Sequence, residues 1–195
     1  MGKQTLRHIH VLSFCPQALD RFTWRHDNVL NLIHDKIQNE LHAGFHMNID
    51  LVKSNDGQSL LIDSSCDTIP PDIACTSLRP DLTLINRQEK TMYICELTVP
   101  FEDNIAKAVE RKFRKYESLV ADIEGNGYKC NYTSIEIGAR GIVGHGLGSL
   151  LKKITVLSKK QRKSMMKEIS QMAIKCSYTI FKNRNDEQFN GTILI

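Results

Sequence analysis

Two strand-like apolar runs followed at once by an amphipathic helix are the feature that most constrains the fold of this chain. The runs are Arg79–Asn86 and Thr91–Val99, and the polar segment Arg87–Lys90 between them is typical of a hairpin turn. Pro100 ends the second run, and from Glu102 to Ile123 the apolar residues recur with the helical period of about 3.6. The sequence therefore predicts a β-hairpin whose second strand leads into a helix.

Further elements are predicted before this hairpin and helix. Apolar residues at helical spacing predict a helix over residues 25–43, which Gly44 ends. Two short strands, 48–53 and 59–63, are predicted to pair around the turn Asn55-Asp56-Gly57. Residues 67–78 contain Pro70-Pro71 and no periodicity, so they are expected to form an exposed loop.

Downstream of the helix, an alternating pattern predicts a strand over residues 129–139. The glycine-rich stretch 141–148 lacks the Lys-Ser/Thr of a phosphate-binding loop and is interpreted as a linker. Helices are predicted over 150–160 and 164–183. From residue 25 to 139 the predicted order is α, β, β, β, β, α, β, which indicates a mixed α/β fold with a central mixed sheet flanked by helices.

Composition excludes several classes of protein. The 195 residues are enough for one domain, and 41% hydrophobic with 25% charged residues is typical of a globular chain. No run approaches the roughly 20 apolar residues of a membrane span. The six cysteines are scattered without a Cys-x-x-Cys pair, and no apolar segment follows the N-terminus. We therefore expect reduced thiols and a nuclear or cytoplasmic protein without a membrane partner.

The positive charge is concentrated near the C-terminus. From Lys152 to Arg184 there are ten Lys and Arg against the single acid Glu168, a net charge of +9, so the rest of the chain carries −5 of the total of +4. A polyanion is the natural partner of such a segment, because neutralising phosphates releases counterions. A solvated helix face is the alternative interpretation. The residues predicted to contact DNA are Lys152, Lys153, Lys159, Lys160, Arg162 and Lys163.

Three residues within the hairpin and helix carry chemistry. Asp81 follows Pro80 at the start of the first strand, and Glu96 is an acid in the middle of the otherwise apolar second strand. Two carboxylates on paired strands can share a divalent cation, since hard oxygen ligands suit Mg²⁺. Lys112 lies near the mean direction of the apolar positions of its helix, where an ammonium needs an anionic partner.

The combination of motifs resembles one known family. The chain is similar to the restriction-like, PD-(D/E)XK endonuclease domain at the C-terminus of site-specific non-LTR retrotransposon proteins, and this resemblance covers nearly the whole chain. The segments that carry the resemblance are Thr23-Trp-Arg-His-Asp-Asn-Val-Leu30, Arg79-Pro-Asp-Leu-Thr-Leu-Ile85, Cys95-Glu-Leu-Thr-Val-Pro-Phe-Glu102, Glu110-Arg-Lys-Phe-Arg-Lys-Tyr116 and the closing helix Ile169–Arg184.

The resemblance implies a PD-(D/E)XK fold and a metal-dependent endonuclease. Such a domain cuts one strand of double-stranded target DNA, and the new 3′-hydroxyl primes reverse transcription. Element RNA and the reverse transcriptase portion of a longer protein are then further partners. In this family the usual lysine of the strand is displaced onto the following helix, and this sequence has Thr98 at the strand position and Lys112 on the helix. Lys115 is the alternative lysine.

The implied roles are as follows. Asp81, Glu96 and Lys112 are the expected catalytic residues, and the Leu97 carbonyl joins the two carboxylates as a ligand of Mg²⁺ or Mn²⁺. Residues expected to support the site or contact phosphate are Arg79, Tyr116, Arg25 and His26.

The N-terminus departs from the family pattern. His10 and Cys15 look like the second half of a CCHC zinc knuckle, but the Cys-x-x-Cys half is absent. Two ligands cannot complete a tetrahedral zinc site, so a structural zinc ion is not expected. The chain is accordingly interpreted as a fragment with a truncated knuckle (1–20), an endonuclease core (21–143) and a basic helical extension (144–195). The alternative function is a catalytically inactive, nucleic-acid-binding remnant of such an element.

Overall fold

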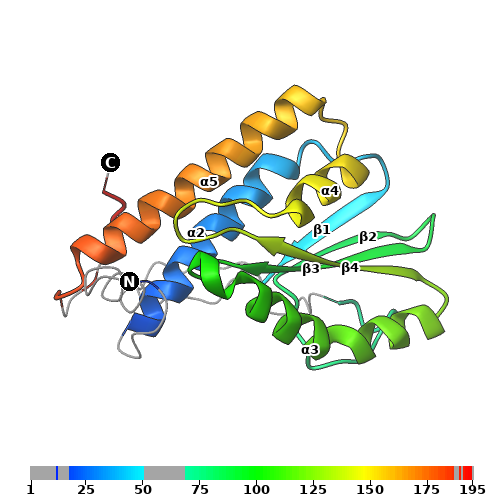
Figure 1. Ribbon diagram of the computed structural model, residues 1–195. Helices are drawn as coiled ribbons and strands as arrows, with labels where there is room; N and C mark the ends of the chain where they lie inside the picture. Colours follow the sequence, from blue (N-terminus) through cyan, green and yellow to red (C-terminus); the bar gives the residue numbers. More distant parts are fainter. Residues whose placement is uncertain (1–11, 13–17, 51–68, 187–188, 190, 195) are drawn as a thin grey trace.

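The computed structural model describes residues 12, 18–50, 69–186, 189 and 191–194, in which helices lie on both faces of one sheet (Figure 1). The sheet has the strand order β1-β2-β3-β4, with β4 parallel to β3 and the other pairs antiparallel. This confirms the predicted mixed α/β class. In chain order the elements are α2 (Leu19–Ile37), β1 (Phe45–Ile49), β2 (Leu82–Asn86), β3 (Thr91–Thr98), the 3₁₀ turn η3 (Glu102–Asn104), α3 (Ile105–Gly125), β4 (Lys129–Glu136), α4 (His145–Ile154) and α5 (Lys159–Lys182).

The predicted hairpin and helix are present. Strands β2 and β3 pair from Leu82 opposite Cys95 to Asn86 opposite Thr91. The turn ends at Lys90, whose φ of 47° lies in the left-handed region, and the Asn86 side chain accepts a hydrogen bond from Glu89 N at 3.0 Å. After Pro100 the chain crosses through η3 and α3 before β4 returns beside β3. A parallel pair requires such a crossover, and α3 supplies it.

The two faces of β3 belong to different hydrophobic clusters, as its alternating sequence requires. Cys95 and Leu97 face one side, where they pack with α2, α4 and α5, whereas Met92 and Ile94 face the side that α3 covers. Figure 1 shows α3 below the sheet and the other three helices above it, with α5 outermost against α2. Glu96, two residues after Ile94, therefore lies on the α3 side.

The boundaries of the first helix and the first strand differ from the sequence expectations. Helix α2 begins at Leu19 rather than at residue 25 and ends at Ile37. Strand β1 occupies Phe45–Ile49 instead of 48–53, because its partner β2 starts only at Leu82. The second strand of the predicted early hairpin, 59–63, lies outside the described residues.

The interpretation of residues 141–148 as a linker is wrong for its second half. Helix α4 begins at His145 and contains Gly146 and Gly148, ending at Ile154 rather than at residue 160. A Cβ atom at Gly146 would lie 1.6 Å from the backbone oxygen of Ser134 in β4. Glycine is required at position 146 because the helix and strand backbones touch there, so Gly146 reflects close packing rather than a flexible connection.

Helix α5 begins five residues earlier than expected, at Lys159, after a capping box in which the Ser158 hydroxyl accepts from Gln161 N at 3.3 Å. Its apolar face packs inward: Met165, Ile169, Ala173, Cys176 and Ile180 are buried, whereas Met172 on the same face is only partly buried. Met165, Ile169 and Ala173 share one core with α2, α4 and the sheet. Among the helices that the structure describes, none is long and apolar enough to cross a membrane.

Candidate active site

The hairpin brings two carboxylates together on the α3 side of the sheet. Asp81 precedes Leu82, which lies opposite Cys95, so Asp81 is adjacent to Glu96. The backbone N–H of Asp81 donates to Glu96 Oε1 at 3.1 Å, and the backbone N–H of Leu97 donates to Asp81 Oδ2 at 2.8 Å. Glu96 is 1% exposed. These reciprocal backbone contacts fix both carboxylates without using their remaining oxygens.

Lys112 reaches this pair from α3. Its Nζ lies 2.8 Å from Asp81 Oδ2, 2.6 Å from Glu96 Oε2 and 2.8 Å from the Leu97 carbonyl oxygen. The three residues expected from sequence to be catalytic therefore meet, and the ammonium has the anionic partners that its position requires.

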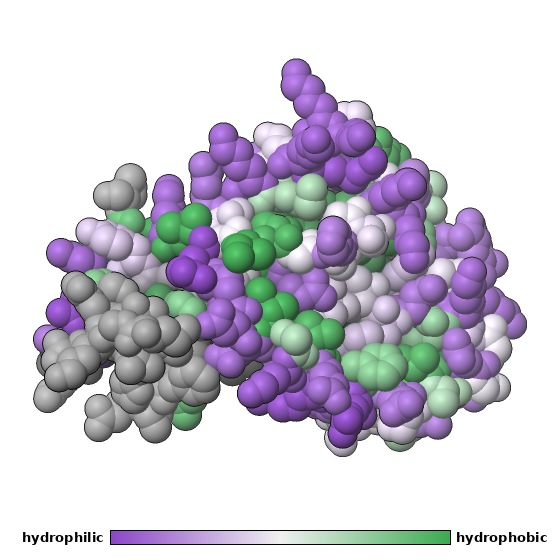
Figure 2. Space-filling model, viewed as in Figure 1, coloured by the Kyte–Doolittle hydropathy of each residue, from purple (hydrophilic) through white to green (hydrophobic). Residues whose placement is uncertain are grey.

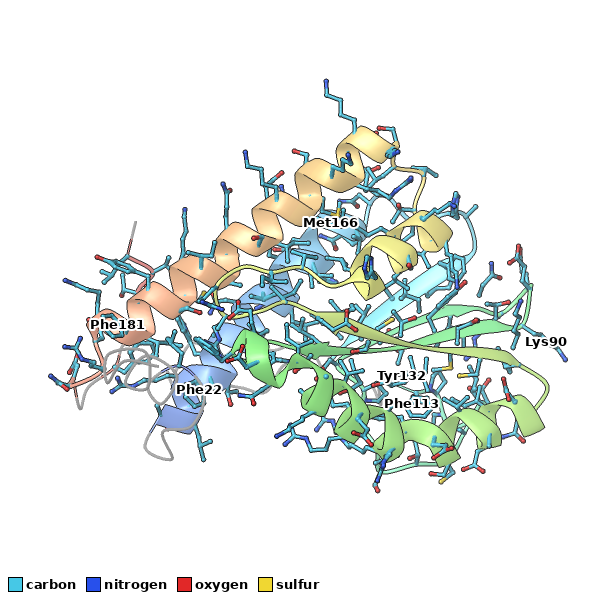
Figure 3. All side chains as sticks on the ribbon, in the orientation of Figure 1. Phe22, Lys90, Phe113, Tyr132, Met166 and Phe181 are labelled. Atoms are coloured by element: carbon cyan, nitrogen blue, oxygen red, sulfur yellow. The ribbon has the colours of Figure 1, made fainter. Side chains whose placement is uncertain are left out.

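The apolar residues of α3 are not all buried. The buried residues are Tyr116, Leu119 and Ile123, whereas Phe113 is 47% exposed. The Phe113 ring contacts Tyr132 of β4 edge-on, at 5.4 Å between ring centroids. Figure 3 labels both residues between α3 and the sheet. Lys112 precedes Tyr116 by one turn and so lies at the end of the buried side that is nearest the carboxylates.

Tyr116 and Arg79 take part through different atoms. The buried Tyr116 hydroxyl donates to the backbone oxygen of Arg79 at 2.8 Å, which ties α3 to the segment that precedes Asp81. The Arg79 guanidinium instead donates to Asp50 at 2.7 Å and is 70% exposed. Lys115, the alternative lysine, donates to the Tyr116 hydroxyl at 2.9 Å. No described contact joins Lys115 to either carboxylate.

His26 of α2 connects to the same site from the other face. Its Nε2 lies 3.3 Å from Asp81 Oδ2 and its Nδ1 lies 3.0 Å from Asp27 Oδ1. Burial alone would lower the pKa of His26, but the hydrogen bonds with Asp27 and Asp81 outweigh it and raise that pKa to about 9. His26 is thus held as an imidazolium beside Asp81. The contribution of Asp27 was not predicted, and no sequence pattern distinguishes this aspartate from an ordinary helix residue.

Arg25 has a different role from its neighbour. It is 2% exposed, and its guanidinium donates to Ser177 Oγ at 3.1 Å, Leu12 O at 3.0 Å and Val99 O at 2.7 Å. Burial lowers its pKa to about 10. These bonds join α2 to α5 and to the end of β3, so they position the elements around the site.

The two carboxylates are electrostatically unequal. Burial opposes ionisation of Asp81, but His26 and Lys112 together lower its pKa to about 2. Burial and the Asp81 charge raise the pKa of Glu96 against the opposing effect of Lys112. The same carboxylates raise the pKa of Lys112 against its desolvation. The site therefore holds a fixed anion, a second carboxylate that resists ionisation and a permanent cation.

A pocket of about 600 Å³ opens beside Lys112 and Asp81, between the first turns of α2 and α3. Lys107 and Arg111, one turn apart on α3, are exposed in its wall. The sequence signal for this pair is their spacing of four residues, which puts both on one side of a helix. Phe22, labelled in Figure 3 on α2, lies on the opposite wall. The other lining residues are Thr23, Arg25, His26, Leu97, Thr98, Val99, Pro100, Asn104 and Ala108.

The residues predicted to contact DNA lie away from this pocket. Lys152 and Lys153 are exposed in the last turn of α4, and Lys159, Lys160 and Lys163 are exposed in the first turns of α5. Arg162 instead turns back and donates to the Leu157 carbonyl. Helix α5 runs antiparallel to α2: Lys36 near the end of α2 bonds Glu168 at 2.5 Å, while the opposite end of α5 meets the start of α2. His10 and Cys15 lie outside the described residues.

The oxygen atoms around Lys112 fit a divalent cation in chemical type. Two carboxylates and a carbonyl converge on one positively charged atom, the Lys112 ammonium, which shows that the arrangement accepts a cation. Such hard oxygen donors suit Mg²⁺ or Mn²⁺, and Mg²⁺ needs few protein ligands because it keeps several waters. Within the described residues no three His, Cys, Asp or Glu side chains gather to hold a metal ion. Beside the two carboxylates, the third oxygen that could hold such an ion is the backbone oxygen of Leu97.

Comparison with models of known protein families gave no match, and comparison with curated protein sequences gave no significant match.

Proposed function

We propose that this chain is a metal-dependent DNA endonuclease domain of the PD-(D/E)XK type, similar to those of site-specific non-LTR retrotransposon proteins. The observation that carries the proposal is the meeting of Asp81, Glu96, the Leu97 carbonyl and Lys112, which come from two strands and a helix. A partly buried lysine held between two acids, with its side chain 22% exposed, is costly as a purely structural device, since well-packed apolar residues serve as well. The position of Lys112 at the edge of a pocket favours a catalytic role.

Each residue has a role in the proposed reaction. Asp81, Glu96 and the Leu97 carbonyl would hold the metal ion, which when bound supplies Lewis acidity toward a phosphate oxygen and a more acidic water. His26 and the Leu97 N–H keep Asp81 ionised and oriented. Lys112 supplies positive charge for the phosphate as negative charge grows in the transition state. Lys107 and Arg111 in the pocket wall are placed to bind neighbouring phosphates.

Double-stranded DNA is the proposed substrate. Element RNA and the reverse transcriptase portion of a longer protein are proposed as further partners from the resemblance alone. Figure 3 shows side chains ending in nitrogen along the outer side of α5, and Figure 2 shows hydrophilic side chains at the same edge of the molecule. Lysines at spacings of three, four, eight and seven residues share this side, and all are exposed; they are Lys160, Lys163, Lys167, Lys175 and Lys182. This surface suits a DNA backbone outside the cleavage pocket.

The test is nicking of supercoiled plasmid in Mg²⁺ or Mn²⁺, with EDTA as the blank. Asp81→Asn and Glu96→Gln should each lower the nicking rate at least about a hundredfold while duplex binding in EDTA stays within a few-fold, because metal ligands serve the transition state more than docking. Lys112→Ala should lose a similar factor, and Lys115→Ala, purified in parallel, should retain most activity.

Two results would contradict the proposal. Nicking that survives in Asp81→Asn and Glu96→Gln would come from another site or a contaminant. Absence of nicking in the unaltered protein, with tight duplex binding retained, would favour the alternative of an inactive nucleic-acid-binding remnant.

A further inference from the structure

The Lys112 ammonium contacts the same three groups, two carboxylates and a carbonyl, that the proposed function assigns to the metal ion. Nζ lies 2.6–2.8 Å from Asp81 Oδ2, Glu96 Oε2 and Leu97 O, which are charge-assisted hydrogen-bond distances. An ammonium has three protons, so these three acceptors satisfy it completely. The cation-binding position defined by these oxygens is thus already occupied by the ammonium of Lys112.

Two cations cannot share these oxygens at once. Mg²⁺ binds oxygen at about 2.0–2.1 Å, and an ammonium still 2.6–2.8 Å from the same three atoms would be in direct contact with it. The charges would repel each other strongly in a site where Glu96 is 1% exposed, because little water is present to screen them. From this geometry, and resting on the proposed function, we infer that Lys112 and the divalent cation occupy the three oxygens in turn, so that Lys112 must withdraw before metal binds.

The surroundings allow this withdrawal without moving the helix. The Lys112 side chain is 22% exposed and lines the 600 Å³ pocket, so its flexible stem can turn toward that space. Lys107 and Arg111 line the same pocket. A DNA phosphate there would receive the released ammonium and compensate for its lost partners. Lys112 is thereby a positioning residue for metal loading as well as a source of charge for the substrate.

Metal affinity in the absence of nucleic acid tests this inference. Lys112→Met keeps the apolar stem and removes the ammonium, so metal binding no longer has to break the hydrogen bonds of Lys112. Mn²⁺ should therefore bind this variant at least about tenfold more tightly than the unaltered protein, a factor that corresponds to one charge-assisted hydrogen bond. Isothermal titration calorimetry measures the dissociation constant, and Asp81→Asn identifies which binding belongs to this site. The matched control is Lys129→Met, an exposed lysine at the start of β4, which should leave the affinity unchanged.

Folding is checked by circular dichroism, and Lys112→Gln provides a second neutral variant if the methionine disturbs packing. Equal Mn²⁺ affinities in the unaltered protein and both Lys112 variants, at a site lost in Asp81→Asn, would overturn the inference while leaving the proposed metal site standing. Absence of Asp81-dependent binding in every variant would instead refute the proposed metal site, and the inference with it.

The unaltered protein gives an independent measurement. Released from its three oxygens, the Lys112 amine should react at least severalfold faster with an amine-directed acylating reagent in saturating Mn²⁺ than in EDTA, as followed by peptide mass spectrometry. Lys129, in the same sample, should react at the same rate in both. A Lys112 rate that does not change with saturating metal would show that the ammonium stays in place, contrary to the inference.

Discussion

The imidazolium of His26 makes the stability of the metal-free protein depend on pH in a calculable way. Its pKa of about 9 exceeds the ordinary value of 6.5 because the bonds with Asp27 and Asp81 outweigh burial. One pKa unit corresponds to about 1.4 kcal/mol, so the shift contributes up to about 3 kcal/mol to the free energy of unfolding. The side chain is 18% exposed, which makes this an upper value with little solvent screening to subtract.

The direction follows from the raised pKa in the folded state. Below about pH 6.5 His26 is protonated in both the folded and unfolded chain, and its full contribution is present. As pH rises from 6.5 toward 9, the unfolded chain loses the proton first, and the contribution disappears. The free energy of unfolding attributable to His26 should therefore fall by up to about 3 kcal/mol between pH 6 and pH 10.

Urea denaturation in EDTA, at steps between pH 6 and pH 10, measures this contribution as the difference between the unaltered protein and His26→Gln. The subtraction removes the titration of cysteines, tyrosines and lysines common to both. His42→Gln, at an exposed histidine of the loop before β1, is the matched control for exchanging a histidine for glutamine. A difference between His26→Gln and the unaltered protein that stays constant from pH 6 to pH 10 would refute the reasoning, since it would mean that Asp27 and Asp81 do not hold a charged imidazole.

Two further predictions concern the outer surface and the packing of the helices. Replacing the five lysines of the outer side of α5 by Gln, in an Asp81→Asn background, should flatten the salt dependence of duplex binding by up to about four counterions. Fluorescence anisotropy in rising KCl measures this slope, and the double variant Lys90→Gln, Lys129→Gln is the control. An unchanged slope would show that DNA does not contact this surface. Gly146→Ala should lower the free energy of unfolding by about 2–4 kcal/mol, because the new Cβ would lie 1.6 Å from Ser134 O. Gly148→Ala in the same helix should be neutral or stabilising, because its Cβ would lie 3.4 Å from Met166 Sδ. Equal urea midpoints for the two variants would argue against the close approach of α4 to β4.

Local patterns in the sequence were sufficient for the hairpin and the helix that follow Arg79. Alternation along β3 assigns Glu96 to the same face as Ile94, and Pro100 marks the end of the strand, because both depend on neighbours a few residues away. The helical period after Glu102 then turns Lys112 toward that face. Asp81, Glu96 and Lys112 could be selected on this basis, and the structure brings them together.

The contacts that adjust this site could not be obtained in that way. His26 meets Asp81 across 55 residues of chain, and Arg25 meets Ser177 across 152. The sequence grouped Arg25 and His26 as residues that support the site or contact phosphate, yet of the two only His26 contacts a carboxylate of the site. Arg25 instead donates to backbone and hydroxyl oxygens. The difference depends on which face of α2 meets the sheet and which meets α5, and periodicity does not specify a helix's neighbours.

The sequence by itself thus determined the local elements and the residues with chemistry to offer, whereas the tertiary structure decided their partners. The glycines of α4 illustrate the reason. Locally, Gly146 and Gly148 weaken a helix and favour a linker. In the folded chain α4 nevertheless forms, and its close approach to the backbone of Ser134 in β4 makes glycine necessary at position 146. The same holds for Lys112, whose ammonium can lie in a desolvated place only because two strands supply the oxygens that surround it. Burial and charge pairing are properties of the assembled layers, and they override propensity wherever distant segments meet.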